Sequence, residues 1–215
     1  MERPRVSIVA DGGFGRALAG TVRALLGGGR CSVSPPGEGL GAFFAEAGFA
    51  MRASWRDVRS EFEAFAAAAD AARVPWLAVA AGPGHIRVGP VVVSGAAPCH
   101  ACFLRRVRQH EADGRAEEIQ RAYEARRGLG VNGYAPHHVA LAAGQALSLC
   151  GQASGPGTLV VGEVRFIDCQ TDEVARLEIA PAQGCGTCDP GHAALAWAAR
   201  RQRQLRDLAS GPEDT

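Results

Sequence analysis

Two cysteine pairs carry the strongest chemical signal in this sequence: Cys99 with Cys102, and Cys185 with Cys188. Each pair has two residues between its cysteines, a spacing that lets both thiolates bind one tetrahedral ion at about 2.3 Å. Proline and glycine residues beside the pairs suit the tight backbone turns that this geometry requires. The sequence therefore predicts a structural zinc site with four sulfur ligands and no open position for catalysis.

The two pairs lie much farther apart than the pairs of a zinc ribbon, so we expect the metal to clasp two distant parts of one fold. Two disulfides, or four unrelated buried thiols, are the alternatives. The metal site is favoured because two such pairs rarely coincide by chance in a chain whose thiols stay reduced. His100 and His192 lie near the pairs and could replace a sulfur ligand, although we expect both to be bystanders.

The composition is typical of a globular protein. The chain has 215 residues, 47% hydrophobic and 21% charged, enough to bury one good core. The formal net charge of +1 gives no reason to expect nucleic acid or an acidic partner. All 23 basic residues are arginine, so no lysine can hold an ATP phosphate, form a Schiff base or act as a general base.

No apolar stretch is long enough for a signal-peptide core or a membrane span, which predicts a cytoplasmic protein without a membrane partner. Three further cysteines, Cys31, Cys150 and Cys169, stand outside the pairs. A buried free cysteine behaves as a small hydrophobic residue, so we assign these three to core packing.

The elements that must position the cysteines begin with a Rossmann-like unit. Residues 6–10 form an apolar strand, a glycine-rich turn follows, and 16–26 have helical apolar periodicity. Glycines in such a turn allow a phosphate to approach the helix N-terminus. The candidate nucleotide-binding residues are Gly12, Gly13 and Gly15.

This glycine loop departs from the dinucleotide fingerprint. Ala10 stands where a glycine is usual, and Asp11 would place a negative charge beside a phosphate. We therefore regard the loop as degenerate and favour a turn kept for packing over a working nucleotide site.

The rest of the first half alternates helix and strand, which predicts parallel strands with crossover helices. Residues 43, 44 and 49 are phenylalanines assigned to the core. The expected strands are 49–54, 76–80, 85–88 and 91–93, the expected helix is 56–72, and 32–40 is expected to be a loop.

The second half follows the first cysteine pair with a charge-rich helix, whose polar surface we expect to be solvated. His137 and His138 start a more apolar helix, where solvent exposure is favoured over a role as metal ligands or acid–base groups. An antiparallel hairpin leads into the second pair. The expected helices are 103–127, 137–149 and 193–208, the hairpin strands are 158–168 and 174–179, and 210–215 is expected to be a disordered tail.

This order of motifs resembles the ThiF-like, ubiquitin-activating-type fold. The resemblance covers residues 6–188 and rests on the glycine turn, on 74–77 before a strand, on 88–93 with its Gly-Pro step, and on the cysteine pairs. More narrowly, the chain is similar to the ThiF-like partner proteins of YcaO cyclodehydratases. These leader peptide-binding proteins act in the biosynthesis of azole-containing ribosomal peptides such as bacteriocins and thiopeptides.

The resemblance implies an α/β, Rossmann-like fold with a mixed sheet, crossover helices and a structural Zn²⁺ on the four paired cysteines. It implies one domain over 1–209, with a Rossmann-like half at 1–95 and a zinc-clasped half at 96–209. It also implies a noncatalytic role, in which a YcaO-type enzyme performs the ATP-dependent chemistry and this chain presents the precursor peptide. Pairing as a homodimer is an expectation from the fold alone.

Departures from the family pattern shape these expectations. The family often carries an N-terminal module that grips the leader peptide, and here the first strand begins at Val6, so we expect that module to be absent. Adenylating members need a complete glycine loop, an arginine and a lysine on the phosphates, and a magnesium-binding aspartate. We assign no catalytic residue and do not expect ATP as a cofactor; Arg16 could reach a phosphate but equally suits a surface position.

Two alternatives stay open. An active ThiF-type enzyme would bind ATP at the glycine loop, adenylate a peptide or carrier C-terminus and pass it to Cys150 or Cys169. A nicotinamide-dependent oxidoreductase with structural zinc would need an acidic ribose-binding residue at the end of the second strand, where the sequence offers no convincing one.

Overall fold

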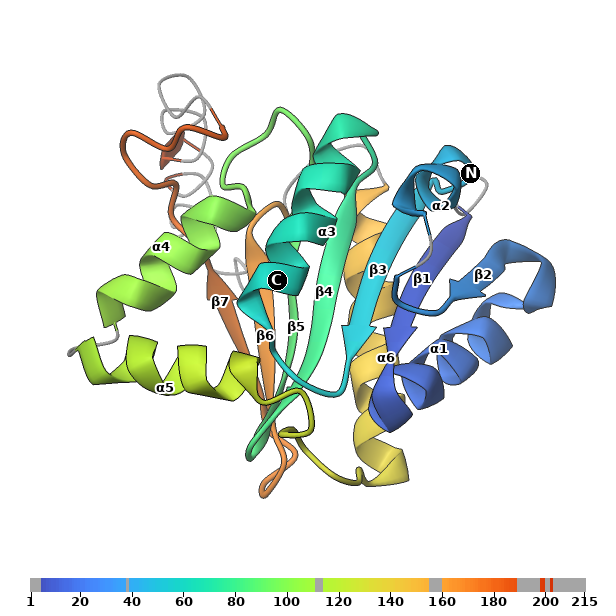
Figure 1. Cartoon of the computed structure of the whole chain (residues 1–215). Coiled ribbons are helices and arrows are strands. Elements are labelled where there is room, and N and C mark those ends of the chain that lie inside the picture. Colours follow the sequence, from blue (N-terminus) through green and yellow to red (C-terminus); the bar gives the residue numbers. More distant parts are fainter. Residues whose placement is uncertain are drawn as a thin grey trace, which may run out of the picture.

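A computed structural model describes residues 5–37, 39–110, 114–154 and 160–188, together with 198, 199 and 202. Its frame is one mixed sheet of seven strands in the order β2-β1-β3-β4-β5-β6-β7 (Figure 1). The expected tail 210–215 and His192 lie outside the described residues, as does most of the expected helix 193–208.

The first four strands pair in parallel, as the alternation of helix and strand predicts. Three helices and one short 3₁₀ turn connect them. The elements are β1 (Val6–Asp11), α1 (Gly12–Leu26), the turn Gly28–Arg30, β2 (Cys31–Ser34), α2 (Leu40–Ala45), β3 (Phe49–Ser54), α3 (Arg59–Ala71) and β4 (Trp76–Gly82).

The remaining three strands extend the sheet in antiparallel fashion. The predicted hairpin before the second cysteine pair is confirmed as β6 with β7. The elements are β5 (His85–Val92), α4 (His100–His110), α5 (Gly114–Ala125), α6 (Pro136–Ala153), β6 (Glu163–Asp168) and β7 (Val174–Glu178).

Both faces of the parallel part are covered, so its strands are apolar on both sides. All six residues of β3 are buried, and they alternate between two cores. Met51 and its face pack with α1 and α6, while Trp76 of β4 lies on the other face among side chains of α2 and α3. In Figure 1, α3 lies in front of the sheet and α6 lies behind it.

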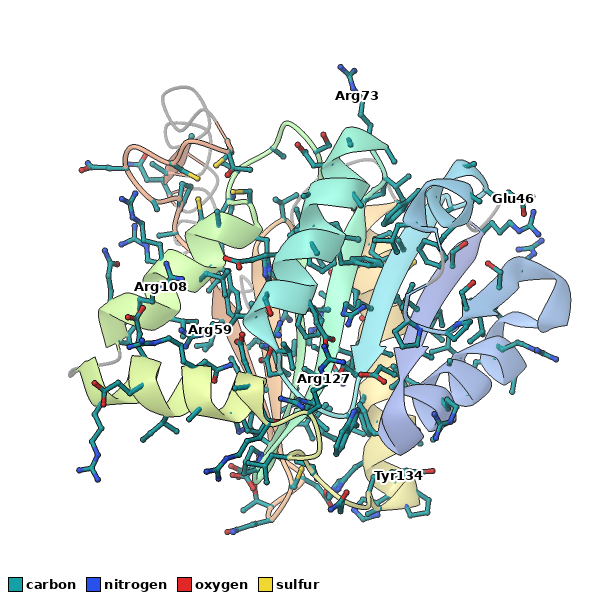
Figure 2. The ribbon with its side chains drawn as sticks, viewed as in Figure 1. Glu46, Arg59, Arg73, Arg108, Arg127 and Tyr134 are labelled. Carbon is teal, nitrogen blue, oxygen red and sulfur yellow. The ribbon has the colours of Figure 1, made fainter. Side chains whose placement is uncertain are left out.

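Charged side chains mostly point away from these cores. Glu46, Arg73 and Arg108 project from the outer surfaces of their elements into solvent (Figure 2). Among the described residues, no helix is both long enough and apolar enough to span a bilayer.

Several boundaries in the first half differ from the sequence predictions: the helix predicted over 56–72 begins only at Arg59, and α2 was not predicted. Cys31–Ser34 is an edge strand where a loop was expected, because a strand of only four residues before two prolines shows little periodicity. The glycine loop forms the first turn of α1, which begins at Gly12. Residues 85–93 do not form two strands, because β5 runs through Gly89 and Pro90 without interruption.

The prediction of a single charged helix over 103–127 is wrong. Two helices occupy this stretch: α4 ends at His110 and α5 begins at Gly114. The pattern of polar and apolar residues continues across the break, so periodicity alone does not separate them. The separation matters, because α5 contacts a different part of the molecule from α4.

One glycine in β5 allows two strands to approach closely. Gly89 has a φ of +104°, and a Cβ there would lie 2.5 Å from the carbonyl oxygen of Glu163 in β6. We expect Gly89→Ala to lower the free energy of unfolding by about 3 kcal/mol, measured by denaturant titration. The control is Gly144→Ala, since Gly144 lies in α6 with open space around it and alanine favours helix there by about 0.5–1 kcal/mol. Equal stability of the two variants would contradict this account of β5.

Candidate metal centre

The four paired cysteines meet at one point. Their sulfur atoms are 3.9 Å apart between Cys99 and Cys102, 3.6 Å between Cys99 and Cys185, and 3.5 Å between Cys102 and Cys188. Four sulfurs bound to one tetrahedral ion at about 2.3 Å would be spaced about 3.8 Å apart. A disulfide needs about 2.0 Å, and all four cysteines are free, so the disulfide alternative is wrong. The cluster has the geometry to hold one metal ion.

Two distant segments bring these sulfurs together, as the spacing of the pairs predicts. Cys99 and Cys102 lie at the start of α4, and the second pair lies in the segment after β7. Yellow sulfur atoms gather beside α4 in Figure 2. Pro98 packs so closely on Gly162 that a Cβ at this glycine would lie 2.3 Å from the proline ring.

Hydrogen bonds from α4 hold the second segment beside the cysteines. Arg106 donates from Nε to the carbonyl of Ala180 at 3.1 Å and from Nη2 to that of Pro181 at 2.7 Å. Arg105 donates to the carbonyl of Gln183 at 2.7 Å. These arginines shape the path of the chain before Cys185, so the sulfurs are positioned by α4 as well as by any ion.

The thiols of the cluster differ in acidity. Burial raises the pKa of the Cys99 thiol to about 11 and also raises the pKa of Cys188. Burial acts in the same direction on Cys185, but the backbone N–H groups of Cys188 and Thr187 outweigh it and lower the Cys185 pKa to about 6. Without an ion, Cys185 therefore loses its proton more readily than Cys99 or Cys188, and a metal ion would have to displace the protons of those two thiols.

His100 is a bystander to the sulfur cluster, as expected. Its ring is 4% exposed and lies 5.3 Å from the ring of Trp76 and 5.8 Å from that of Phe103, measured between centroids. Burial, reinforced by the nearby charge of Arg87, lowers the pKa of His100 to about 3, so the ring is neutral at pH 7. Neither ring nitrogen has a hydrogen-bond partner within the part of the chain that the structure describes. His100 packs among aromatic rings between the metal cluster and the sheet.

The glycine loop lies where an α/β sheet usually binds its ligand. The chain passes from β1 to β2 on one side and then to β3 on the other, so the strand order reverses between β1 and β3. Gly12 follows β1 and Trp55 follows β3 at the carboxyl ends of these strands. A nucleotide would be expected in the crevice between them.

Trp55 lies against the glycine loop at this point. A Cβ on Gly12 would lie 2.2 Å from the Trp55 side chain, and a Cβ on Gly130 would lie 2.5 Å from the other end of the same ring. The indole is therefore held between two glycine backbones. Gly15 serves packing too, because a Cβ there would lie 2.5 Å from the carbonyl oxygen of Ala53 in β3. Contacts within the chain thus account for Gly12 and Gly15 without a ligand.

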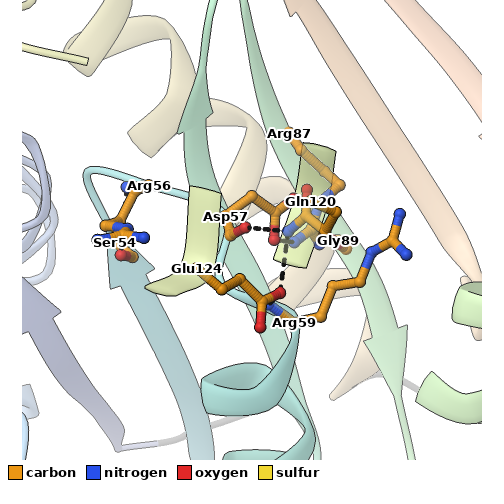
Figure 3. Close-up of polar contacts among 8 residues, drawn as sticks. All are labelled: Ser54, Arg56, Asp57, Arg59, Arg87, Gly89, Gln120 and Glu124. Atoms are coloured by element: carbon orange, nitrogen blue, oxygen red, sulfur yellow. Dashed lines mark hydrogen bonds and ion pairs between the residues drawn. The ribbon is translucent and has the colours of Figure 1, made fainter. Parts of the chain in front are cut away.

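A polar cluster continues from Trp55 along the same edge of the sheet (Figure 3). Asp57 accepts two hydrogen bonds from Arg87, at 2.9 Å from Nε and at 2.7 Å from Nη2. Arg87 is buried in β5, so this bidentate pair neutralises a charge inside the protein. Burial raises the pKa of Asp57, but the guanidinium of Arg87 outweighs it, and the net effect holds this pKa below its ordinary value.

The same cluster fastens α5 over the start of α3. Val58 at the N-cap of α3 makes no side-chain cap, and the backbone N–H of Arg59 donates to Glu124 of α5 at 2.9 Å. Arg56 donates to the carbonyls of Tyr123 and Arg126 at 2.7 and 3.1 Å. Sequence reasoning missed these contacts, because nothing local pairs α3 with a helix so far along the chain.

The three remaining thiols are poor nucleophiles. Cys150 lies on the buried face of α6 and is 3% exposed, and burial raises its pKa to about 12. Burial also raises the pKa of Cys31 and of Cys169. The thiolate is the reactive form of cysteine, so the packing role assigned to these residues accords with their surroundings.

Comparison with solved structures finds similar folds. A chain of the E. coli microcin synthetase McbBCD complex has a TM-score of 0.64 and 8% identity, covering 84% of this chain and 67% of that one. The heterocyclase TruD has a TM-score of 0.59 and 18% identity, and the match covers 86% of this chain and 28% of the TruD chain. The structure of E. coli MccB with ATP has a TM-score of 0.54 and 13% identity, and the match covers 86% of this chain and 67% of the MccB chain.

At these identities the likeness establishes the fold, and it confirms the α/β, Rossmann-like architecture expected from the resemblance to ThiF-like proteins. The chain spans only 28% and 25% of the two heterocyclase chains that it matches. No protein-family model matches the sequence, and no curated protein matches it either.

If the four cysteines bind a metal, replacing one of them should reduce both the metal content and the stability of the protein. Cys99→Ser should release the metal and lower the free energy of unfolding by several kcal/mol, because structural zinc contributes folding energy directly. Elemental analysis and thermal melting would measure both effects. The control is Cys31→Ala, a buried thiol outside the cluster that should keep one equivalent of metal. A Cys99→Ser protein that keeps its metal and melts like the wild type would exclude the cluster as a metal centre.

The ion pair of Asp57 and Arg87 predicts a pH-dependent contribution to the free energy of unfolding. Asp57→Asn should lower the free energy of unfolding by about 2 kcal/mol at pH 7, less than for a fully buried pair because the Asp57 side chain is 41% exposed. A lowered carboxyl pKa stabilises the fold above about pH 4, and this stabilisation disappears as pH falls through the folded-state value. The difference from wild type should therefore shrink on acidification. Glu117→Gln, which removes an exposed ion pair with Arg108, is the control and should change stability by less than about 0.5 kcal/mol. A pH-independent difference for Asp57→Asn would contradict the assignment.

Proposed function

We propose that this protein is a noncatalytic scaffold that presents a precursor peptide to a YcaO-type cyclodehydratase during ribosomal peptide biosynthesis. Its partners would be that enzyme and the precursor peptide, with a second copy of the chain as a further candidate. Residues 1–209 would act as a single ThiF-like domain. The proposal agrees with the fold, which is similar to chains of the heterocyclase TruD and the microcin synthetase McbBCD complex.

The observation that carries the noncatalytic role is the position of Trp55. Its indole lies at the carboxyl ends of β1 and β3, in contact with the backbone of Gly12 and Gly130. A phosphate that approached the backbone of Gly12 would meet this side chain, which lies close to both glycines. The absence of lysine from the sequence adds a second reason, because no lysine can neutralise a triphosphate.

Within this proposal, the four cysteines hold a structural Zn²⁺. Four thiolates suit zinc, and the sulfur spacings of 3.5–3.9 Å match a closed tetrahedral site. The ion would fix α4 against the segment after β7 and supply no chemistry to a substrate. The ion would keep α4 and the segment after β7 in a fixed arrangement that a partner could bind. The four cysteines would take no part in the reaction.

A second candidate is an active ThiF-type adenylating enzyme, which the likeness to E. coli MccB with ATP favours. This candidate requires Gly12, Gly13 and Gly15 to bind ATP and a thiol such as Cys150 or Cys169 to accept the product. Burial of Cys150 and the raised pKa of both thiols weigh against the second requirement.

ATP–pyrophosphate exchange separates the two candidates. Purified protein, mixed with precursor peptide, should bind no ATP and give no exchange above background, while a ThiF-type adenylating enzyme assayed in parallel gives a signal. A YcaO-type enzyme should co-purify with the protein and form azoles faster in its presence. Exchange above background would overturn the scaffold role.

A variant of the loop provides the matched control. Asp11→Asn changes the charge beside the glycine loop, and Asp11 makes only a long contact of 3.5 Å with Ser54. A scaffold should keep its affinity for the YcaO-type enzyme within about twofold, whereas an enzyme that binds ATP there should change its exchange rate when this charge is removed.

A further inference from the structure

Three potential metal ligands converge away from the cysteine cluster, at the start of α6. His137 and His138 are the second and third residues of this helix, and Asp172 lies in the turn between β6 and β7. The Nε2 atom of His138 is 2.9 Å from Oδ1 of Asp172, and the Nε2 atom of His137 is 3.3 Å from the same oxygen. All three potential ligand atoms lie within 4.8 Å of one another.

This convergence is unusual for adjacent residues. Neighbouring positions on a helix differ by about 100° around its axis, so their side chains normally point apart. Here the rings of His137 and His138 have centroids only 4.1 Å apart, and both turn a nitrogen toward one carboxylate. Asp172 reaches them from a left-handed backbone conformation with φ of +60°, which aspartate adopts more readily than most residues.

The spacing of the three atoms suits a first-row divalent cation. Nitrogen and oxygen ligands bind zinc at about 2.0–2.1 Å, which places them about 3.3 Å apart in a tetrahedral site. The two nitrogen–oxygen distances, 2.9 and 3.3 Å, are close to this value. Two imidazoles with one carboxylate form a donor set for zinc, cobalt, nickel or iron rather than for calcium or magnesium.

This cluster differs from the four cysteines in its access to water. The side chains of His137 and Asp172 are 62% and 56% exposed, while that of His138 is 11% exposed. Three ligands leave one tetrahedral position free, and the exposed residues leave that position facing solvent. In Figure 1 the start of α6 and the β6–β7 turn lie at the lower edge, together with the carboxyl ends of β1 and β3. Ligands of open α/β sheets bind at this edge.

We propose that His137, His138 and Asp172 form a second metal site, which holds a divalent transition-metal ion such as Zn²⁺ by three protein ligands. The fourth position is open to water or to a donor atom of another molecule. Unlike the cysteine cluster, this site can exchange its ion and its outer ligand without disturbing a core. The site is independent of the scaffold role, because it rests only on the geometry of these three residues.

Cobalt titration tests the second site. Untagged protein with its cysteine cluster filled by zinc should bind one further equivalent of Co²⁺, with visible d–d absorption and without thiolate-to-cobalt charge transfer. Asp172→Asn and His138→Gln should each weaken this binding by at least about tenfold, because loss of a direct ligand costs no less than loss of an outer-shell partner. Asparagine tolerates the left-handed conformation, so Asp172→Asn should keep the turn.

The control is His110→Gln, an exposed histidine at the end of α4, which should bind the second equivalent like the wild type. Melting curves of all variants should show that the fold persists. Failure of the wild type to bind a second equivalent would overturn the proposal. Equal binding by Asp172→Asn, His138→Gln and the wild type would overturn it too, and would mean that the three side chains form only a hydrogen-bonded cluster.

Discussion

The gathering of four sulfur atoms at one point is the constraint on which the second half of this molecule depends. The segment after β7 has little regular structure, and its position is set by hydrogen bonds to Arg105 and Arg106 and by the sulfurs it shares with α4. Protonated thiols carry no charge and do not hold one another by ionic attraction. A bound metal ion would join the four sulfurs through metal–sulfur bonds.

One hydrophobic core extends under both the parallel and the antiparallel strands of the sheet. Its parallel strands are buried on both faces under α1, α2, α3 and α6, and their order follows from apolar runs separated by helices. Its antiparallel strands β5 and β6 are also largely buried, and they add the close backbone approach at Gly89 and the paired charges of Asp57 and Arg87. The two halves of the fold are therefore one sheet, held partly by hydrophobic burial and partly by specific polar contacts.

Local patterns predicted much of this, and contacts between distant segments account for the rest. The cysteine spacing and the apolar runs of β1, β3 and β4 are visible in the sequence. The edge strand Cys31–Ser34 and the break between α4 and α5 were missed because each is short or shares the periodicity of its surroundings. Three contacts form only after folding, so no local sequence pattern reveals them. They join Glu124 to the N-terminus of α3, Trp55 to Gly12, and Asp172 to His138.

The indole of Trp55 has a consequence for regulation. Many α/β proteins use the crevice between reversing strands to sense a small molecule, and their activity then follows its supply. A chain whose own tryptophan covers Gly12 would not respond to a nucleotide phosphate at this loop. Its contribution to an assembly would be set by how many copies are made and by which partners they meet.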